Sequence, residues 1–422
     1  MPSAPPATSE SPHWRGNLFV CVFGSFTTIM AMTLLLPFLP LYVEQLGVHD
    51  HAAIVELSGI AFGATFFTAA LVAPLWGHLA DLYGRKLMMI RASLGMAVAM
   101  SLIGLAQNVW QLVALRLLAG LLGGYASGST ILVATQTPKG RSAWALGTLS
   151  AGIMAGNLVG PLVGGVLPPL IGIRSTFLAA GALIFVAFLA TAFLIREDKR
   201  PAATPKSRQR GIWRSVPNKR PAIAMLVTGL LLLFANMSIE PIITVYVATL
   251  VPAPDRITIV SGLAMSAAAL GTILSASQLG KLADRIGHRT VIIAGLLAAA
   301  ALLIPQAFVT NGWQLIALRF LMGIALGGLL PCIATVIRHN VPDNAAGGVL
   351  GYSTSAQYIG QVAGPLAGGF VGGHIGMRAV FLGTSALMAI GAVWTWWALR
   401  AEAKASKAGG PAPSTPAKGI GP

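Results

Sequence analysis

Charged residues are scarce in this sequence: only 9% of the 422 residues are Asp, Glu, Lys or Arg, whereas 55% are hydrophobic. A soluble domain carries roughly a quarter of its residues as charges. Most of the surface must therefore face something other than water, which excludes an ordinary soluble protein. Cysteine is nearly absent. Cys21 and Cys332 both lie in apolar runs, where we expect small buried side chains and no disulfide.

The sequence also lacks the motifs of several function classes. It has no Walker loop, so we do not expect ATP to drive its function, and no metal-binding or catalytic constellation, so we expect no enzyme, cofactor or metal site. An acidic ring or carbonyl filter, which would indicate a channel, is missing. We expect no signal peptide, because the first 17 residues are polar and Pro-rich and the next apolar run is too long.

What the sequence does contain is a series of apolar runs long enough to cross a bilayer as helices of about 20 residues. Backbone polar groups in lipid must be satisfied within their own segment, which excludes open strands. The predicted fold class is an all-α polytopic membrane protein with twelve transmembrane helices. We expect spans at 18–42, 57–78, 87–106, 110–134, 143–167, 173–195, 221–249, 258–279, 290–309, 313–336, 347–371 and 377–399.

The net charge of +16 follows this topology. With the N-terminus inside, three basic residues (Arg174, Arg256 and Arg378) fall outside and two (Arg116 and Arg319) fall within spans, which leaves 23 of the 28 Lys and Arg on the cytoplasmic side. This is the positive-inside pattern, and it predicts that both termini are cytoplasmic. We therefore expect a lipid bilayer and no nucleic acid around the chain, and we expect a monomer.

The chain repeats itself at an offset of 203 or 204 residues, which predicts two six-helix bundles related as parallel repeats. The matched segments are Gly77–Lys86 with Gly280–Arg289, Trp110–Arg116 with Trp313–Arg319, and Gly160–Gly165 with Gly364–Gly369. The expected order is a disordered cytoplasmic tail (1–17), the first bundle (18–196), a basic cytoplasmic linker (197–220), the second bundle (221–400) and a disordered cytoplasmic tail (401–422).

Three motifs resemble those of the major facilitator superfamily. Gly77-x-Leu-Ala-Asp81-x-x-Gly84-Arg85-Lys86 resembles its loop signature, and Arg116-x-x-Ala-Gly120 resembles its span-4 arginine motif. Gly156-x-x-x-Gly160-Pro161-x-x-Gly164-Gly165 is similar to the motif of its drug:proton antiporters. The resemblance covers about residues 17–400. It implies a transporter of the bacterial inner membrane that exports small, varied, drug-like compounds by alternating access, coupled to protons.

The resemblance further implies a cytoplasmic gate that closes while the exterior is open. Its residues would be Gly77, Asp81, Gly84, Arg85, Asp284 and Arg285. The alternative is that Arg85 and Lys86 are only topology charges. The sequence departs from the family pattern at Leu82, where Arg is usual, and has His288 where the first half has Arg85. These departures predict weaker or redistributed charge contacts at the gate.

The span-5 motif places glycines four residues apart on one helix face, which allows close helix contact, and Pro161 removes one backbone hydrogen bond. Its residues are Gly156, Gly160, Pro161, Gly164 and Gly165. We expect a tight, bent helix at the seam between moving parts. Ordinary small-residue packing explains the glycines equally well, so only the resemblance assigns the motif to antiport.

Charged residues within the bilayer are functional by default, because each is costly there. Arg116, Glu240 and Arg319 fall within the predicted spans, the two arginines at matching depths. Burial disfavours an ionised carboxyl and a neighbouring Arg favours it, so Glu240 is the candidate proton carrier. Glu240 also precedes Pro241, which biases it away from helix. A static Glu240–Arg319 bridge and a partly wetted Glu240 remain open.

A polar stripe at helical spacing in span 11 must face protein or water rather than lipid. It supplies part of the expected substrate cavity, whose candidates are Tyr125, Asn157, Asn236, Met237, Gln357, Tyr358 and Gln361. Helix–helix hydrogen bonding is the alternative for these side chains. At the level of function, the alternatives to drug export are a proton-coupled transporter of a single metabolite, such as a sugar derivative or organic anion, and a membrane sensor or scaffold.

Overall fold

The computed structural model describes residues 13–197, 216 and 218–408, and its regular elements in these ranges are all helices. The first half comprises α1 (Trp14–Leu34), η1 (Leu36–Phe38), α2 (Leu39–Gln45), α3 (His51–Tyr83), α4 (Arg85–Gly104), α5 (Val109–Leu122), α6 (Tyr125–Gln136), η2 (Lys139–Arg141), α7 (Ser142–Ile171) and α8 (Ile173–Leu194). The second half comprises α9 (Lys219–Ile239), η4 (Glu240–Ile242), α10 (Ile243–Leu250), η5 (Pro254–Arg256), α11 (Ile257–Ile286), α12 (His288–Gln306), α13 (Gly312–Leu326), α14 (Leu329–Asn340), α15 (Asp343–His374) and α16 (Met377–Ala408).

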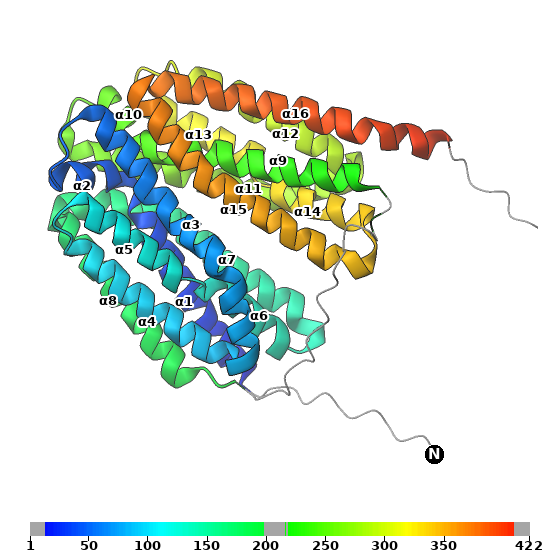
Figure 1. Cartoon of the computed structure of the whole chain (residues 1–422), viewed down its shortest axis with the longest axis horizontal. Helices are drawn as coiled ribbons and strands as arrows, with labels where there is room; N and C mark the ends of the chain where they lie inside the picture. Colours follow the sequence, from blue (N-terminus) through cyan, green and yellow to red (C-terminus); the bar gives the residue numbers. More distant parts are fainter. Residues whose placement is uncertain (1–12, 198–215, 217, 409–422) are drawn as a thin grey trace, which may run out of the picture.

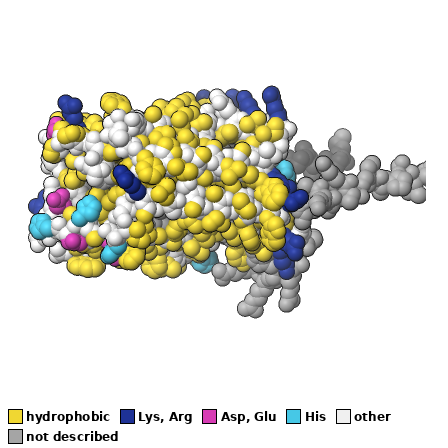
Figure 2. All heavy atoms as spheres, turned by 90° about the horizontal axis from the view of Figure 1, so that it is seen from above, with side chains coloured by type: hydrophobic (Ala, Val, Ile, Leu, Met, Phe, Trp, Pro, Cys, Tyr) yellow, Lys and Arg dark blue, Asp and Glu magenta, His cyan; other side chains and the backbone are white. Residues whose placement is uncertain are grey.

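The two halves form two helical bundles that lie next to each other (Figure 1). The start of α1, the end of α8 and the start of α9 lie on one side, called here the terminal side. The α2–α3 and α10–α11 connections lie on the opposite side. Charged side chains gather mostly near these two ends on the face that Figure 2 shows, and hydrophobic and uncharged groups cover the middle. This is the surface of a multi-pass membrane protein.

Eleven helical segments of the described chain are long and apolar enough to cross a membrane. The twelfth predicted span is α15, which has 32 residues, but its glycines and polar side chains lower its hydropathy. The twelve-span, all-helical fold class is therefore confirmed, with α15 as the helix whose composition departs most from a lipid-facing one.

Four of the twelve spans are broken rather than continuous. Span 1 divides at η1 and span 7 at η4, where Pro37 and Pro241 each lack a backbone donor. Span 4 divides at Gly124, whose φ of +108° favours glycine, and span 10 divides at Gly327 and Gly328. The uninterrupted spans that we predicted at these places are corrected accordingly, although the bias of Glu240 away from regular helix was expected.

Several predicted boundaries shift by a few residues. Residues 14–17, assigned to the N-terminal tail, belong to α1, and Asn17 is buried against Gln136 and the end of α8. Residues 401–408, assigned to the C-terminal tail, continue α16, and α9 already begins at Lys219 within the predicted linker. The remainder of the predicted tails and linker (1–12, 198–215, 217 and 409–422) lies outside the described residues.

The two halves use matching contacts, as their sequence repeat predicts. The Tyr42 hydroxyl donates to the Ile103 carbonyl at the end of α4, and the Tyr246 hydroxyl donates to the Gln306 carbonyl at the end of α12. Each tyrosine ring also packs on a phenylalanine, Phe177 in the first half and Phe381 in the second, with ring centroids 5.2 and 5.1 Å apart. Both short helices after the breaks are thus anchored to their own bundle in the same way.

The halves meet through small residues and hydroxyl groups rather than ion pairs. The side-chain hydrogen bonds between the halves within the described ranges come from Thr244, Thr258 and Ser266 of the second half, which donate to carbonyls of α7 and of the η1 segment. Thr244 and Thr258 lie toward the opposite side, and Ser266 lies deeper in α11. On the terminal side, α14 and α15 diverge from α6 and α1 (Figure 1). The molecule is therefore joined on the opposite side and parted on the terminal side.

Candidate transport site

A cavity of about 460 Å³ lies between the two halves, and both halves contribute to its wall. Most of the lining is apolar, with Met, Phe and Leu side chains from α1, α3, α9, α11 and α13. Polar groups are few, which is typical of sites that bind small molecules mainly by shape and apolar contact. The predicted site residues that line it are Arg116, Asn157, Pro161, Asn236, Met237, Glu240, Arg319 and Gln361.

Glu240 and Arg319 lie next to each other in the wall of this cavity. Oε1 of Glu240 lies 3.6 Å from Nη2 of Arg319, which is an ion pair but longer than a hydrogen bond. The Arg319 side chain is 1% exposed and the Glu240 side chain 14% exposed. Oε2 of Glu240 and Nε and Nη2 of Arg319 have no hydrogen-bond partner among the described residues. The pair is thus close and incompletely satisfied.

Glu240 owes its position to the break in span 7. It begins η4 directly before Pro241, so α9 ends at the level of the cavity and the chain restarts as α10. Broken backbone at membrane depth is tolerated where it lines a cavity. The repeat-related position in span 1 is Leu36, which also lines the cavity, so the carboxyl is specific to the second half.

Arg116 is the repeat-related counterpart of Arg319 but is held differently. Its Nε donates to the Ala61 carbonyl of α3 at 3.2 Å, and its guanidinium carbon lies 5.9 Å from the Phe62 ring centre. No carboxylate lies within 4 Å of Arg116 in the described parts of the chain. The two intramembrane arginines are therefore not equivalent: Arg116 is fixed by backbone, and Arg319 is paired with Glu240.

Three predicted cavity residues lie elsewhere. The Tyr125 hydroxyl is buried inside the first half, 2.7 Å from the Thr191 hydroxyl, and the ring fills the space beside Gly24. Gln357 is half-buried near Gly229 of α9, and its amide donates to Ser353 at 3.4 Å. Tyr358 is half-buried outside the cavity wall. Of the span-11 stripe, Gln361 alone is among the residues that line the cavity, and Gln357 lies near α9 instead.

The span-5 motif forms contacts on two faces of α7. A Cβ at Gly156, Gly160 or Gly164 would collide with carbonyl oxygens of α1, whereas one at Gly165 would collide with the Thr258 carbonyl of α11. The second half repeats this: Gly360, Gly364 and Gly368 lie against α9, and Gly369 lies against α3. The motif helix is therefore packed tightly within its own half and also contacts the other half through Gly165.

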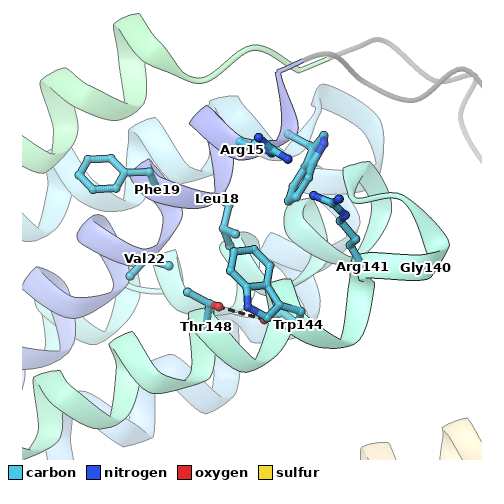
Figure 3. A pocket seen from close by; sticks show the side chains of 9 residues that line it. Arg15, Leu18, Phe19, Val22, Gly140, Arg141, Trp144 and Thr148 are labelled. Atoms are coloured by element: carbon cyan, nitrogen blue, oxygen red, sulfur yellow. Dashed lines mark hydrogen bonds between the residues drawn. The ribbon is translucent and has the colours of Figure 1, made fainter.

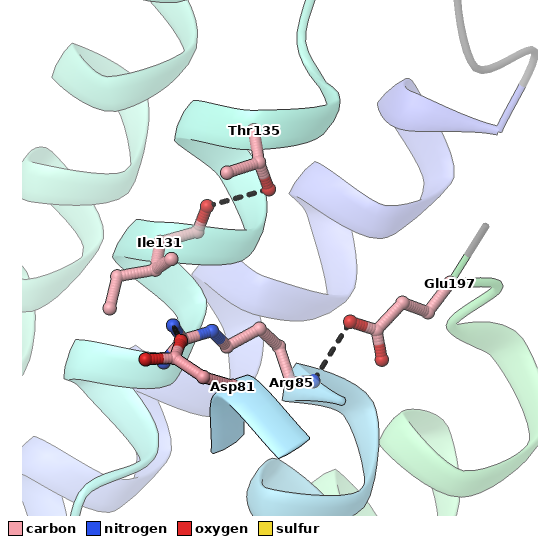
Figure 4. A network of polar contacts seen from close by, with 5 residues as sticks. All are labelled: Asp81, Arg85, Ile131, Thr135 and Glu197. Atoms are coloured by element: carbon pink, nitrogen blue, oxygen red, sulfur yellow. Dashed lines mark hydrogen bonds and ion pairs between the residues drawn. The ribbon is translucent and has the colours of Figure 1, made fainter. Parts of the chain in front are cut away.

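The loop signature makes its charge contacts within the first half. Arg85 pairs with Asp81 one helical turn away (Figure 4). Gly84 adopts a φ of +96° between α3 and α4. The backbone N–H groups of Arg85 and Lys86 donate to the two carboxylate oxygens of Glu197 at 2.8 and 2.7 Å. In the second half, Asp284 lies 3.5 Å from His288. No ion pair joins the loops of the two halves among the described residues, which fits a parted terminal side.

Sequence analysis did not identify two residues that have structural roles, Glu197 and Arg91. Glu197 caps the N-terminus of α4 from 111 residues away along the chain, a contact that only tertiary structure provides. Arg91 stacks on Trp76 at 3.5 Å and donates to the Gly123 carbonyl at 2.9 Å, so it satisfies the backbone freed by the break in span 4. Arg91 is the seventh residue of α4 and lies inside the predicted span 87–106, although it was counted with the cytoplasmic basic residues; its charge within an apolar run was the available signal.

Two helical bundles in parallel repeat, with a cavity and buried charges at their seam, define a secondary transporter. The profile described as Major Facilitator Superfamily matches residues 21–253 and 258–420, so this chain belongs to that superfamily. It is 43% identical over 389 residues to proteins named multidrug resistance protein MdtG from Salmonella arizonae and Salmonella typhimurium, covering 92% of this chain and 96% of each relative. The resemblance drawn from the motifs is confirmed.

Solved structures share the fold at low sequence identity. A bacterial homolog to the human lysosomal transporter Spinster has a TM-score of 0.75 and 16% identity, covering 93% of this chain and 98% of that one. The nucleoside transporter NupG has a TM-score of 0.70 and 14% identity, covering 90% and 99%. At this identity the likeness establishes the architecture alone.

Proposed function

We propose that this chain is a proton-coupled exporter of small, chemically varied, drug-like compounds in the bacterial inner membrane, with both termini in the cytoplasm. The observation that carries the proposal is the mostly apolar cavity with a carboxyl at its wall. An apolar wall with few polar groups recognises compounds loosely, and the similarity to multidrug resistance proteins supports this substrate class.

Glu240 is the proposed proton carrier, with Arg319 and Arg116 as its partners. An ionised Glu240 is attracted to Arg319 at 3.6 Å, and a protonated Glu240 is not, so protonation weakens the one ion pair at the cavity wall. Release of Arg319 then changes the charge that a substrate meets. Because Arg116 is held by the Ala61 carbonyl and not by a carboxylate, it keeps its place when Glu240 is protonated.

In this proposal the terminal side is cytoplasmic, so the described conformation corresponds to the inward-open state of the cycle. Closure of the terminal side brings the loops after α3 and α11 together, and Gly77, Asp81, Gly84, Arg85, Asp284 and Arg285 are the proposed gate. Since Asp81–Arg85 and Asp284–His288 pair within their own loops here, gate closure requires these charges to exchange partners. The glycines of α7 and α15 supply the seam about which the halves rock.

The proposal is tested by transport in vesicles together with a resistance profile. Cells that overproduce the wild type should survive higher concentrations of several unrelated toxic compounds, and proteoliposomes should move protons when such a compound is added. If no compound gives protection and none moves protons, the export function is wrong. If a single organic anion alone drives proton movement, the chain is a metabolite transporter, for which the unpaired Arg116 would be the anion-binding group.

A further inference from the structure

A second hollow, of about 640 Å³, lies on the first half at the terminal side, between the start of α1, the start of α7 and the turn η2. Trp14 and Trp144 form its aromatic wall, with ring centroids 6.4 Å apart and planes nearly perpendicular. Arg15 and Arg141 border it, and Phe19 lies at its edge (Figure 3). Neither the transport cycle nor the gate uses any of these side chains.

This hollow faces away from the central cavity. Thr148 lines the hollow and Asn157 lines the cavity, and both lie on α7 nine residues apart. Nine residues are about two and a half turns of helix, so the two side chains point to opposite faces. Phe19 and Trp144 are 73% and 62% exposed, and large apolar groups exposed on a membrane protein face lipid. The hollow therefore opens to the bilayer near its terminal-side surface.

The charge of the hollow is wholly positive. The guanidinium carbons of Arg15 and Arg141 lie 5.4 and 6.0 Å from the Trp14 ring centre, so both cations are held over one aromatic ring. The residues that line the hollow include no acid, and neither arginine forms an ion pair in the described ranges. Because both cations lie beside one ring and no acid lines the hollow, an anion bound beside Trp14 is attracted by both arginines.

The repeat shows that this arrangement is not required by the fold. At an offset of 203 or 204 residues, Arg141 corresponds to Asn344 or Ala345 and Trp144 corresponds to Gly347 or Gly348. The second half forms the same bundle without the paired arginine and tryptophan. Arg141 and Trp144 are therefore not part of the scaffold that the two halves share.

We propose that this hollow binds an anionic phospholipid, with the phosphate near Arg15 and Arg141 beside Trp14 and an acyl chain along Phe19 and Val22. A basic pocket between helices at the membrane surface suits a lipid headgroup, and tryptophans are favoured at that level of the bilayer. The apolar wall distinguishes this site from one for a soluble phosphate, which gains nothing from Phe19 and Val22. The bound lipid joins the start of α1 to α7, the helix that carries the glycine motif.

The test uses the full chain in phosphatidylcholine vesicles that contain a small fraction of dibrominated lipid, which quenches nearby tryptophan fluorescence. Dibrominated phosphatidylglycerol should quench the wild type more than dibrominated phosphatidylcholine does. Arg15→Gln/Arg141→Gln should reduce this preference roughly tenfold or more, since each basic group near the surface contributes to anionic-lipid affinity. Arg338→Gln/Arg400→Gln, which removes two exposed arginines of the second half, one of them over Trp396, should keep it.

The other outcomes of this experiment contradict the proposed lipid site. Equal quenching of the wild type by the two lipids, or loss of preference in Arg338→Gln/Arg400→Gln, overturns the proposal. So does persistence of the extra quenching in Trp14→Phe/Trp144→Phe, because these two of the nine tryptophans report the site. If millimolar glycerol 1-phosphate abolishes the preference, the hollow is a site for soluble phosphate and not for lipid.

Discussion

The carboxylate of Glu240 and the guanidinium of Arg319 lie 3.6 Å apart at the wall of the central cavity, near enough to attract and too far to share a hydrogen bond. A structural bridge at this depth would be expected to satisfy more of its donors and acceptors. The loose geometry instead suits a pair that opens and closes during transport, and it leads to the first two predictions.

Glu240→Gln is expected to abolish proton-driven efflux while leaving substrate exchange in place. Gln keeps the shape of the side chain but carries no exchangeable charge, so binding and rocking continue without coupling. In proteoliposomes with an imposed proton gradient, the wild type should concentrate substrate. Its transport rate should fall when the pH on the acidic side is raised, because this dissipates the gradient. The variant should exchange labelled substrate at similar rates at every pH.

The control for that experiment is Glu44→Gln, which changes an exposed acid of α2 outside the cavity. It should retain gradient-driven efflux. Normal gradient-driven efflux by Glu240→Gln would make the Glu240–Arg319 pair structural.

Removal of Arg319 alone should destabilise the protein more than removal of both partners. Arg319→Met leaves a buried carboxylate without its counter-charge, which costs on the order of 3–5 kcal/mol. In Glu240→Gln/Arg319→Met no unpaired charge remains, so most of that stability should return although coupling stays lost. The melting temperatures of the wild type, Glu240→Gln, Arg319→Met and the double variant are compared by thermal unfolding in detergent. Additive destabilisation by the two changes would mean that the pair is not coupled.

Gly160→Ala should impair folding and transport, because the added Cβ would collide with the Met30 carbonyl and the Thr33 side chain of α1. Overpacking of this kind costs about 1–3 kcal/mol. Gly147→Ala, on the same helix with open space around it, is the matched control and should behave as wild type. Equal melting temperatures for the two variants would show that α1 and α7 do not pack as tightly as described.

Gly165→Ala should act on the conformational equilibrium instead of on the fold of one half. Its Cβ would meet the Thr258 carbonyl across the seam, so it disfavours closure of the opposite side. We expect increased distances across that side, measured between spin labels on introduced cysteines after replacement of the native Cys21 and Cys332. Unchanged distances, with a lowered melting temperature, would assign Gly165 to packing alone.

Glu197→Ala should lower stability by about 1 kcal/mol, because it leaves two N–H groups of α4 without their carboxylate acceptor. The loss should be smaller for Glu197→Gln, which keeps an acceptor oxygen but not the charge. The two variants and the wild type are compared by thermal unfolding at low salt. If Glu197→Ala has the same melting temperature as the wild type, this cap does not contribute to stability.

Much of the architecture followed from the chain itself. Apolar runs of membrane length, the positive-inside pattern and the offset repeat each depend on local composition or periodicity, so they predicted an all-helical fold of two six-helix halves without knowledge of contacts. The charges at Arg116, Glu240 and Arg319 were found for the same reason: a charged side chain within an apolar run is visible in the sequence alone.

The remainder depended on how helices turn and pack. Asn157, Asn236, Met237 and Gln361 reach the cavity, while Tyr125, Gln357 and Tyr358 do not, because a polar residue in a span faces either a cavity or another helix and composition does not distinguish the two. The distant cap by Glu197 and the hollow beside Trp14 and Trp144 join segments far apart in the chain, and the break at Gly124 is supported by Arg91 of α4. The sequence by itself determined which residues enter the membrane and that the halves repeat; only tertiary packing decided that Glu240 meets Arg319 while Arg116 is held by backbone, since that depends on the distance between helices.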